Sequence, residues 1–234
     1  MTGAGVRVGK AIALALAGAG ADVAVHYNSS SAAAEQVCLE IRALGRRAIA
    51  IAGDLARPET AAAVVAAARQ GLGRLDVLVP SASNFRRAAL EETTPEIWDA
   101  AMNLNVRAGF LLARAAAAEL RSRQGRIVFI SDALATRMVP GYLAHSVSKA
   151  AVEGLVRALA AELAPEVSVN GVSPGTVLVP EGTPPEDAAR WARAVPARRN
   201  GTPGDVAETV LFLCSGPAYI TGQIFAVDGG KAVV

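Results

Sequence analysis

The sequence predicts a doubly wound α/β fold, with a parallel sheet covered by helices on both faces. Short runs rich in β-branched residues alternate with longer Ala- and Leu-rich segments of helical period, which is typical of right-handed βαβ units. The strand-like runs are "ADVAVHY" (21–27), "RAIAIAG" (47–53), "LDVLVP" (75–80), "GRIVFIS" (125–131), "VSVNGVS" (167–173) and "GQIFAVDGG" (222–230). Helices are expected near 8–19, 31–44, 58–72, 95–122, 146–164 and 205–215.

Length and composition indicate one domain. A chain of 234 residues, 52% of them hydrophobic and 19% charged, can bury a full core, so we assign residues 1–234 to a single domain. The segment 179–204 breaks the alternation with Pro, Gly and charged residues. We expect it to form a mobile flap or a loop with a short helix.

Composition also argues against several classes of protein. The net charge of +2 is spread along the chain without a basic run, so neither nucleic acid nor a membrane surface is an expected partner. Cys38 and Cys214 stand far apart in apolar contexts, so we expect free thiols and no metal site. Signal-peptide and membrane-span patterns are missing, so a cytoplasmic location is expected.

The start of the chain is unusual for such a fold. A glycine-rich turn normally follows the first strand, which is central in the sheet, yet Met1 stands directly before Thr2. We therefore expect the fold to lack its first strand, which would leave two strand edges unpaired. Our hypothesis is that the natural start lies upstream and that Met1 represents an initiator such as GTG.

The glycine turn predicts a site for a dinucleotide. In "TGAGVRVG" (2–9), glycines 3, 5 and 9 precede a helix whose free N–H groups and dipole favour a pyrophosphate. At the end of the next strand, "VHYNSS" (25–30) offers no acidic residue to select NAD. Asn28, Ser29 and Ser30 could bind a 2′-phosphate, and Arg7 supplies positive charge, so NADPH is the expected cofactor.

The ordered motifs resemble the short-chain dehydrogenase/reductase family over essentially the whole chain. They are "TGAGVRVG", "GDL" (53–55), "MNLNV" (102–106), "HSVSK" (145–149), "VNGVSPG" (169–175) and "YITGQIFAVDGG" (219–230). The resemblance implies a Rossmann-type fold, a nicotinamide cofactor and a homo-oligomer, commonly a tetramer. It also implies that Asp54 lies by the adenine, Asn105 helps to hold a water and the lysine, and Lys149 binds the nicotinamide ribose.

Site residues follow from matching these motifs position by position. The resemblance implies a cofactor site made of Gly3, Arg7, Val8, Gly9, Tyr27, Asn28, Ser29, Ser30, Asp54, Leu55, Ser81, Ala82, Lys149, Pro174, Gly175 and Thr176. It implies a catalytic set of Asn105, Asp132, His145 and Lys149.

Within that family the sequence is most similar to pteridine reductases. Arg7 stands where most relatives have glycine, "HYNSS" (26–30) matches their "HY" segment, and Asp132 stands where most have the catalytic serine. "SASNF" (81–85) is similar to their pterin-binding turn. The likeness implies that Arg7, Ser83, Phe85 and Tyr142 contact a flat substrate such as a pterin.

Two positions depart from the family pattern. Pro80 replaces an asparagine of the expected Asn-Asn-Ala turn, which removes an N–H and an amide side chain. His145 stands where the catalytic tyrosine is expected, four residues before Lys149 and on the same helical face. Histidine can transfer protons near neutral pH, although its side chain is shorter. We interpret His26 as a structural residue at a strand end.

Three functions remain open at this point. The sequence favours an NADPH-dependent reductase of a pterin or dihydropterin, with Asp132 and His145 relaying the proton. A carbonyl reductase of the 3-oxoacyl type is the alternative within the same class. The third is an NADP-binding protein that is catalytically impaired because His145 replaces the tyrosine.

Overall fold

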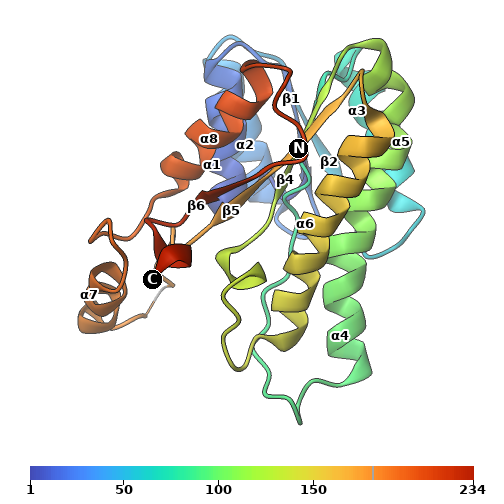
Figure 1. Cartoon of the computed structure of the whole chain (residues 1–234). Helices are drawn as coiled ribbons and strands as arrows, with labels where there is room; N and C mark the ends of the chain where they lie inside the picture. The colour runs from blue at the N-terminus through green and yellow to red at the C-terminus, as the bar shows by residue number, and fades with distance from the viewer. Residues whose placement is uncertain (181) are drawn as a thin grey trace.

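The computed structural model describes residues 1–180 and 182–234 and shows an α/β fold with parallel strands (Figure 1). One sheet pairs β1 (Val23–Tyr27) with β2 (Ala48–Ala52). The other has the order β3 (Val77–Leu78), β4 (Arg126–Ile130), β5 (Ser168–Pro174) and β6 (Ile224–Val227). All these pairs are parallel, which confirms the predicted doubly wound class.

Helices form a layer on each face of the sheets, as Figure 1 shows. One layer contains α1 (Arg7–Gly18), α2 (Ser31–Ala43) and α8 (Pro203–Ser215). The other contains α3 (Thr60–Leu72), α5 (Ala108–Ser122) and α6 (Leu143–Leu163). Shorter elements are α4 (Pro95–Ala101), the π-helix η1 (Met102–Arg107), the 3₁₀ turns η2 (Ala133–Ala135) and η3 (Lys231–Val233), and α7 (Pro185–Arg193).

Strand β4 shows how the two layers are held. Its side chains alternate between faces, as those of a strand do. Val128 packs with Ile12 of α1 and Val210 of α8. Its neighbours Ile127 and Phe129 belong to the core on the opposite side, with α3, α5 and α6. A buried apolar run in the sequence therefore becomes a strand that packs on both faces.

Several predicted elements differ from the structure in length. The predicted helix at 95–122 contains the π-helix η1 between α4 and α5, where the backbone takes one extra residue per turn. The predicted strand at 75–80 is reduced to Val77–Leu78. Helix α6 begins at Leu143, earlier than the predicted 146. The segment 179–204 contains α7, and residue 181 of it lies outside the described residues.

The predicted lack of a first strand corresponds to a gap between the two sheets. Residues 1–4 bridge this gap at the carboxyl ends of the strands. On one side, His26 of β1 donates from its N–H to the carbonyl of Met1 and accepts from the N–H of Ala4. On the other side, Thr2 donates from its N–H to the carbonyl of Val79, just beyond β3. The two sheets are thus joined next to the glycine turn.

His26 links three segments at this joint. Its ring is buried, with Nδ1 accepting from the N–H of Gly3 at 3.4 Å and Nε2 donating to the carbonyl of Gly53 at 3.0 Å. These contacts require the neutral ring with its hydrogen on Nε2. Burial lowers the pKa of His26 to about 4. This is the structural role predicted for His26 from the sequence.

We predict that His26 makes the fold acid-sensitive. Between pH 6.5 and about 4 the unfolded chain binds a proton at His26 that the folded chain does not, so stability falls as pH falls, by at most about 1.4 kcal/mol per pH unit. Urea unfolding of the wild type and His26→Gln at pH 7, 6 and 5 measures this effect. The stability difference between the two proteins should shrink towards pH 5, and equal pH slopes would contradict the assignment.

Candidate active site

A large cleft runs along the carboxyl ends of the strands. It has a volume of about 1920 Å³, enough for a dinucleotide and a second small molecule. The glycine turn, the loops after β3, β4 and β5, and the segment after β6 all contribute to its lining. In Figure 1 the loops that follow β3 and β4 and the helix α7 gather at the lower edge of the fold.

The glycine turn before α1 forms one end of the cleft. A Cβ atom on Gly9 would lie 2.0 Å from the carbonyl oxygen of Gly3, and a Cβ on Gly3 would lie 3.0 Å from Cα of Ala82. Only glycine fits at these two positions. No side chain caps the start of α1, so its first N–H groups are available to an anion. The turn therefore fits the pyrophosphate of a dinucleotide.

Arg7 is held in an unusual backbone conformation. Its φ of +54° lies in the left-handed region, where a side chain is unfavourable by about 1–2 kcal/mol. Arg7 and Val8 both line the cleft. The strained backbone thus places a cationic side chain at the entrance to the phosphate site.

The predicted adenine site is only partly assembled in the cleft. Asn28 and Leu55 line it together with Gly53. Asp54 accepts the N–H of Ala56 and stays partly exposed beside the cleft. Tyr27, Ser29 and Ser30 likewise lie outside the lining; Tyr27 accepts a hydrogen bond from Ser31.

The residues predicted to lie beside the nicotinamide come from the loops after β3 and β5. Ser81, Ala82, Pro174, Gly175 and Thr176 all line the cleft. The N–H groups of Ser81 and Ala82 both donate to Oγ1 of Thr2, and Pro80 accepts from Ile130 through its carbonyl. Thr2 therefore braces the turn in which Pro80 replaces the expected asparagine.

Lys149 projects from α6 into this region. The residue is buried, with 4% of its surface exposed to solvent, and its Nζ donates to the carbonyl of Ile130 at 2.9 Å. Burial lowers the pKa of Lys149 to about 8, although Asp132 nearby opposes that shift. The ammonium group therefore retains unused donors in the cleft at neutral pH.

His145 and Asp132 form a pair at the chemical end of the cleft. Nε2 of His145 lies 3.5 Å from Oδ2 of Asp132, and Nδ1 donates to the carbonyl of Asn84 at 3.1 Å. Oδ1 of Asp132 accepts the N–H of Leu134 at 2.8 Å. The His145 side chain is 3% exposed and its Nε2 is shielded from solvent, whereas the Asp132 side chain is 30% exposed. The carboxyl group, rather than the imidazole, is the part of this pair that a substrate can reach.

A closed ring of hydrogen bonds orients His145. Nδ2 of Asn105 donates to Oγ of Ser148, whose hydroxyl donates to the carbonyl of His145. Oδ1 of Asn105 accepts the N–H of Asn84, whose carbonyl accepts Nδ1 of His145. The ring thus fixes the histidine through both its backbone and its imidazole. Asn105 lies in the π-helix and does not contact Lys149 by a hydrogen bond within the described chain.

Asn84 and Ser148 are members of this ring that the sequence did not indicate. Asn84 acts through its backbone carbonyl, and its side chain donates to the carbonyl of Ala100 at 2.9 Å. A backbone acceptor leaves no trace in residue type. Ser148 stands within the quoted motif "HSVSK", which was the available signal for it.

Aromatic side chains cover the histidine. The ring of Phe85 stacks on Tyr142 with centroids 4.8 Å apart and meets His145 edge-on at 4.7 Å. Phe85 remains 58% exposed towards the cleft. Ser83 lines the cleft as well, but Oδ1 of Asn105 and the carbonyl of Asn84 both lie within hydrogen-bond distance of its hydroxyl, whose one hydrogen is used within the protein. The site therefore offers a flat apolar surface beside Asp132.

Membrane spans, metal clusters and cysteines were also addressed by the sequence. The described residues include no helix with both the length and the apolar character to cross a membrane, and their His, Cys, Asp and Glu side chains form no cluster of three that could hold a metal ion. Cys38 and Cys214 are free thiols, as predicted.

We predict opposite effects of Arg7→Gly on stability and on binding. Glycine removes the left-handed strain, so the free energy of unfolding should rise by about 1 kcal/mol. Loss of the cation should weaken NADPH binding at least tenfold and NADH binding much less. Arg7→Ala is the matched control, because it removes the charge but keeps the strain. Urea unfolding and fluorescence titration measure both effects, and unchanged NADPH affinity in both variants would contradict the role of Arg7.

Comparison with known proteins agrees with this geometry. The family model described as enoyl-(acyl carrier protein) reductase matches residues 3–232. The chain is 38% identical over 237 residues to a 3-oxoacyl-[acyl-carrier-protein] reductase of Synechocystis sp., covering 100% of this chain and 96% of that protein. It is 40% identical over 249 residues to the short-chain dehydrogenase/reductase FrzI of Cladobotryum sp., covering 100% and 95%.

A solved structure shares both the fold and much of the sequence. The blue fluorescent protein from a metagenomic library, in complex with NADPH, matches with a TM-score of 0.91 and 37% identity over 99% of this chain and 96% of that chain. The chain therefore belongs to the short-chain dehydrogenase/reductase family, in the group that the enoyl-(acyl carrier protein) reductase model describes.

Proposed function

We propose that this protein is an NADPH-dependent oxidoreductase that reduces the carbonyl group of a small molecule. One observation carries the proposal: Asp132, His145 and Lys149 lie in the same cleft as the glycine turn. That arrangement places a proton source and a dinucleotide site side by side. The 3-oxoacyl-[acyl-carrier-protein] reductase among the relatives and the NADPH complex among the similar structures support this choice.

The residues of the cleft fit NADPH. The start of α1 and the glycine turn would hold the pyrophosphate. Arg7 and Asn28 would bind the 2′-phosphate, since no acidic side chain at the end of β1 repels it. Lys149 would donate to the nicotinamide ribose. When bound, the cofactor supplies a hydride to the substrate carbon.

The chain itself supplies the proton. Nδ1 of the imidazole donates its hydrogen to the carbonyl of Asn84, so Nε2, 3.5 Å from Oδ2 of Asp132, is the nitrogen that would exchange a proton with the carboxyl group. Because Oδ1 is occupied by Leu134, Oδ2 is the oxygen that can take this proton and pass it to the substrate oxygen. His145 thus acts as the proton reserve and Asp132 as the group that touches the substrate.

A pterin or dihydropterin is the second candidate substrate. The exposed face of Phe85 suits a flat heterocycle, and Asp132 could protonate a ring nitrogen as well as a carbonyl oxygen. Arg7, which stands where most relatives have glycine, is a further feature in which this protein resembles pteridine reductases. The hydroxyl of Ser83 argues against a pterin substrate, because it already donates within the protein.

We also propose a homo-oligomer, a tetramer by analogy with the family, and a cytoplasmic location. Phe110 on α5 is 41% exposed, and a partner helix packed on α5 would cover it. The pattern of cysteines suits a reducing compartment.

The test measures NADPH oxidation with a 3-oxoacyl thioester and with dihydrobiopterin. We expect the wild type to reduce the thioester, and Asp132→Asn to lower kcat/KM about 100-fold while the Kd for NADPH changes less than twofold. His145→Phe should also lower kcat, and His145→Tyr should retain activity because it restores a hydroxyl. Asp99→Asn, an exposed carboxylate on α4, is the control.

Two other results of this assay would each indicate a different function. Turnover of dihydrobiopterin without the thioester would favour the pterin candidate. NADPH binding without turnover in the wild type would refute the proposed proton transfer, and activity that appears only in His145→Tyr would identify an impaired nucleotide-binding protein.

A further inference from the structure

Two segments face each other at the outer mouth of the cleft. Residues 85–88 follow β3, and residues 137–142 lead into α6. Ala88 donates from its N–H to the carbonyl of Gly141 at 2.9 Å, and Ala88 and Tyr142 form an isolated parallel bridge. The two segments are therefore held together by backbone contacts, with the Phe85–Tyr142 stack on their inner side.

The side chains of both segments alternate. On the first, Phe85 and Arg87 line the cleft and Arg86 does not. On the second, Arg137 and Val139 line the cleft and Met138 does not. This is the pattern of extended chain, in which neighbouring side chains point to opposite sides. Each segment thus presents one cation and one apolar or aromatic side chain to the cleft.

Both of these arginines keep donors for a ligand. Across residues 1–180 and 182–234, neither Arg87 nor Arg137 has an acidic oxygen within 4.0 Å. Arg137 uses one nitrogen, Nη1, which donates to the carbonyl of Lys231 at 3.0 Å. That bond fixes the side chain against η3 and leaves its other N–H groups available.

Three carboxylates among the described residues of the cleft already have partners within the protein. Asp132 faces His145, and Asp205 holds Arg199 at 2.8 Å. Asp228 accepts the N–H groups of Gly230 and Ala232. Glu208, which also lines the cleft, lies on α8 with Asp205. None of these four carboxylates lies within 4.0 Å of a side-chain nitrogen of Arg87 or Arg137.

Gly141 leaves room for the side chain of Arg87. The φ of Gly141 is +86°, and a Cβ atom there would lie 3.2 Å from Nε of Arg87. A side chain at position 141 would therefore crowd the guanidinium group. The glycine lets Arg87 lie along the opposite segment, next to Tyr142 and the aromatic stack.

We propose that Arg87 and Arg137 form an oxyanion subsite, and that the substrate carries a carboxylate or phosphate group in addition to its reacting carbonyl. The planar donor fork of arginine suits either group. The flat part of the substrate lies against Phe85 and Tyr142, between Asp132 and the anion. This inference rests on the proposed carbonyl reduction in the same cleft and names the substrate class.

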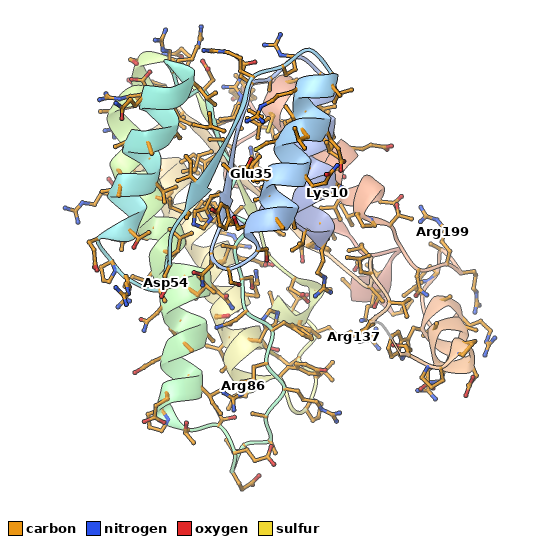
Figure 2. All side chains as sticks on the ribbon, turned by 180° about the vertical axis from the view of Figure 1, so that it is seen from behind. Lys10, Glu35, Asp54, Arg86, Arg137 and Arg199 are labelled. Carbon is orange, nitrogen blue, oxygen red and sulfur yellow. The ribbon has the colours of Figure 1, made fainter. Side chains whose placement is uncertain are left out.

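The experiment compares three aromatic ketones that differ in charge. They are 4-acetylbenzoate, 4-acetylphenyl phosphate and the neutral methyl 4-acetylbenzoate. Arg87→Ala should raise KM for the preferred anionic ketone at least tenfold and leave the ester within twofold. Arg137→Gln should act in the same direction. Arg86→Ala is the matched control, because it removes the same charge from the adjacent position outside the cleft lining; Figure 2 labels Arg86 and Arg137.

Preference between the carboxylate and the phosphate identifies which oxyanion the subsite takes. Equal KM values for the ester and both anions in the wild type would overturn the proposal. Equal losses in Arg86→Ala and Arg87→Ala would also overturn it, because they would indicate diffuse surface charge. Such a result would suit docking of an acidic carrier protein instead.

Calorimetry with 4-acetylbenzoate and the NADP⁺-loaded protein, which cannot reduce the ketone, separates this proposal from the proposed function. If no ketone is reduced in the NADPH assay but Arg87→Ala, unlike Arg86→Ala, abolishes binding of 4-acetylbenzoate, the subsite stands and the reductase assignment fails. If the wild type does not bind 4-acetylbenzoate or 4-acetylphenyl phosphate, the subsite is refuted even where the neutral ester is reduced.

Discussion

The arrangement of the site depends on how residues 1–4 join the two sheets. Strands β1 and β3 are not paired with each other along their length, so their carboxyl ends are held together by hydrogen bonds to Met1, Thr2 and Ala4. The same segment continues into the glycine turn, and Thr2 also braces Ser81 and Ala82. The phosphate end and the chemical end of the cleft therefore take their relative position from one short stretch of backbone.

Histidine stands at position 145, where the family resemblance implies a catalytic tyrosine, and its contacts differ from those that a freely exposed acid would make. The imidazole is buried under Phe85 and bound to Asn84, which keeps Nε2 out of the open cleft. Asp132 then becomes the exposed member of the pair. The proton transfer that we propose requires both side chains in fixed positions, and the ring through Asn105 and Ser148 holds His145 in place.

Charge is distributed unevenly along the cleft. Arg7 lines the cleft beside the glycine turn, Arg87 and Arg137 line it on the two mouth segments, and Asp132 lines it beside His145. A molecule that spans this cleft is favoured if its negative groups lie at the two ends and its flat, weakly polar part lies at Phe85. The buried Lys149 adds a cation close to the reaction, at the cost of a lowered pKa.

The sequence by itself determined the order of strands and helices, the glycine turn and the motif residues at the ends of the strands. Those features follow from local periodicity and from glycines at positions where the backbone leaves no room for a side chain, such as Gly3 and Gly9. Asp132 follows the strand-like run at 125–131, and the family resemblance implied that Lys149 belongs to the same site.

The tertiary structure alone decided the π-helix around Asn105, the ring through the carbonyl of Asn84, and the burial of Nε2 of His145. It also decided which of Arg86 and Arg87 lines the cleft. Each depends on contacts between segments far apart in the chain, such as Asn84 with His145 at a separation of 61 residues. Residue type and local pattern carry no information about the direction of a backbone carbonyl or the packing of a ring, and so the sequence could name the site residues but not the contacts that hold them.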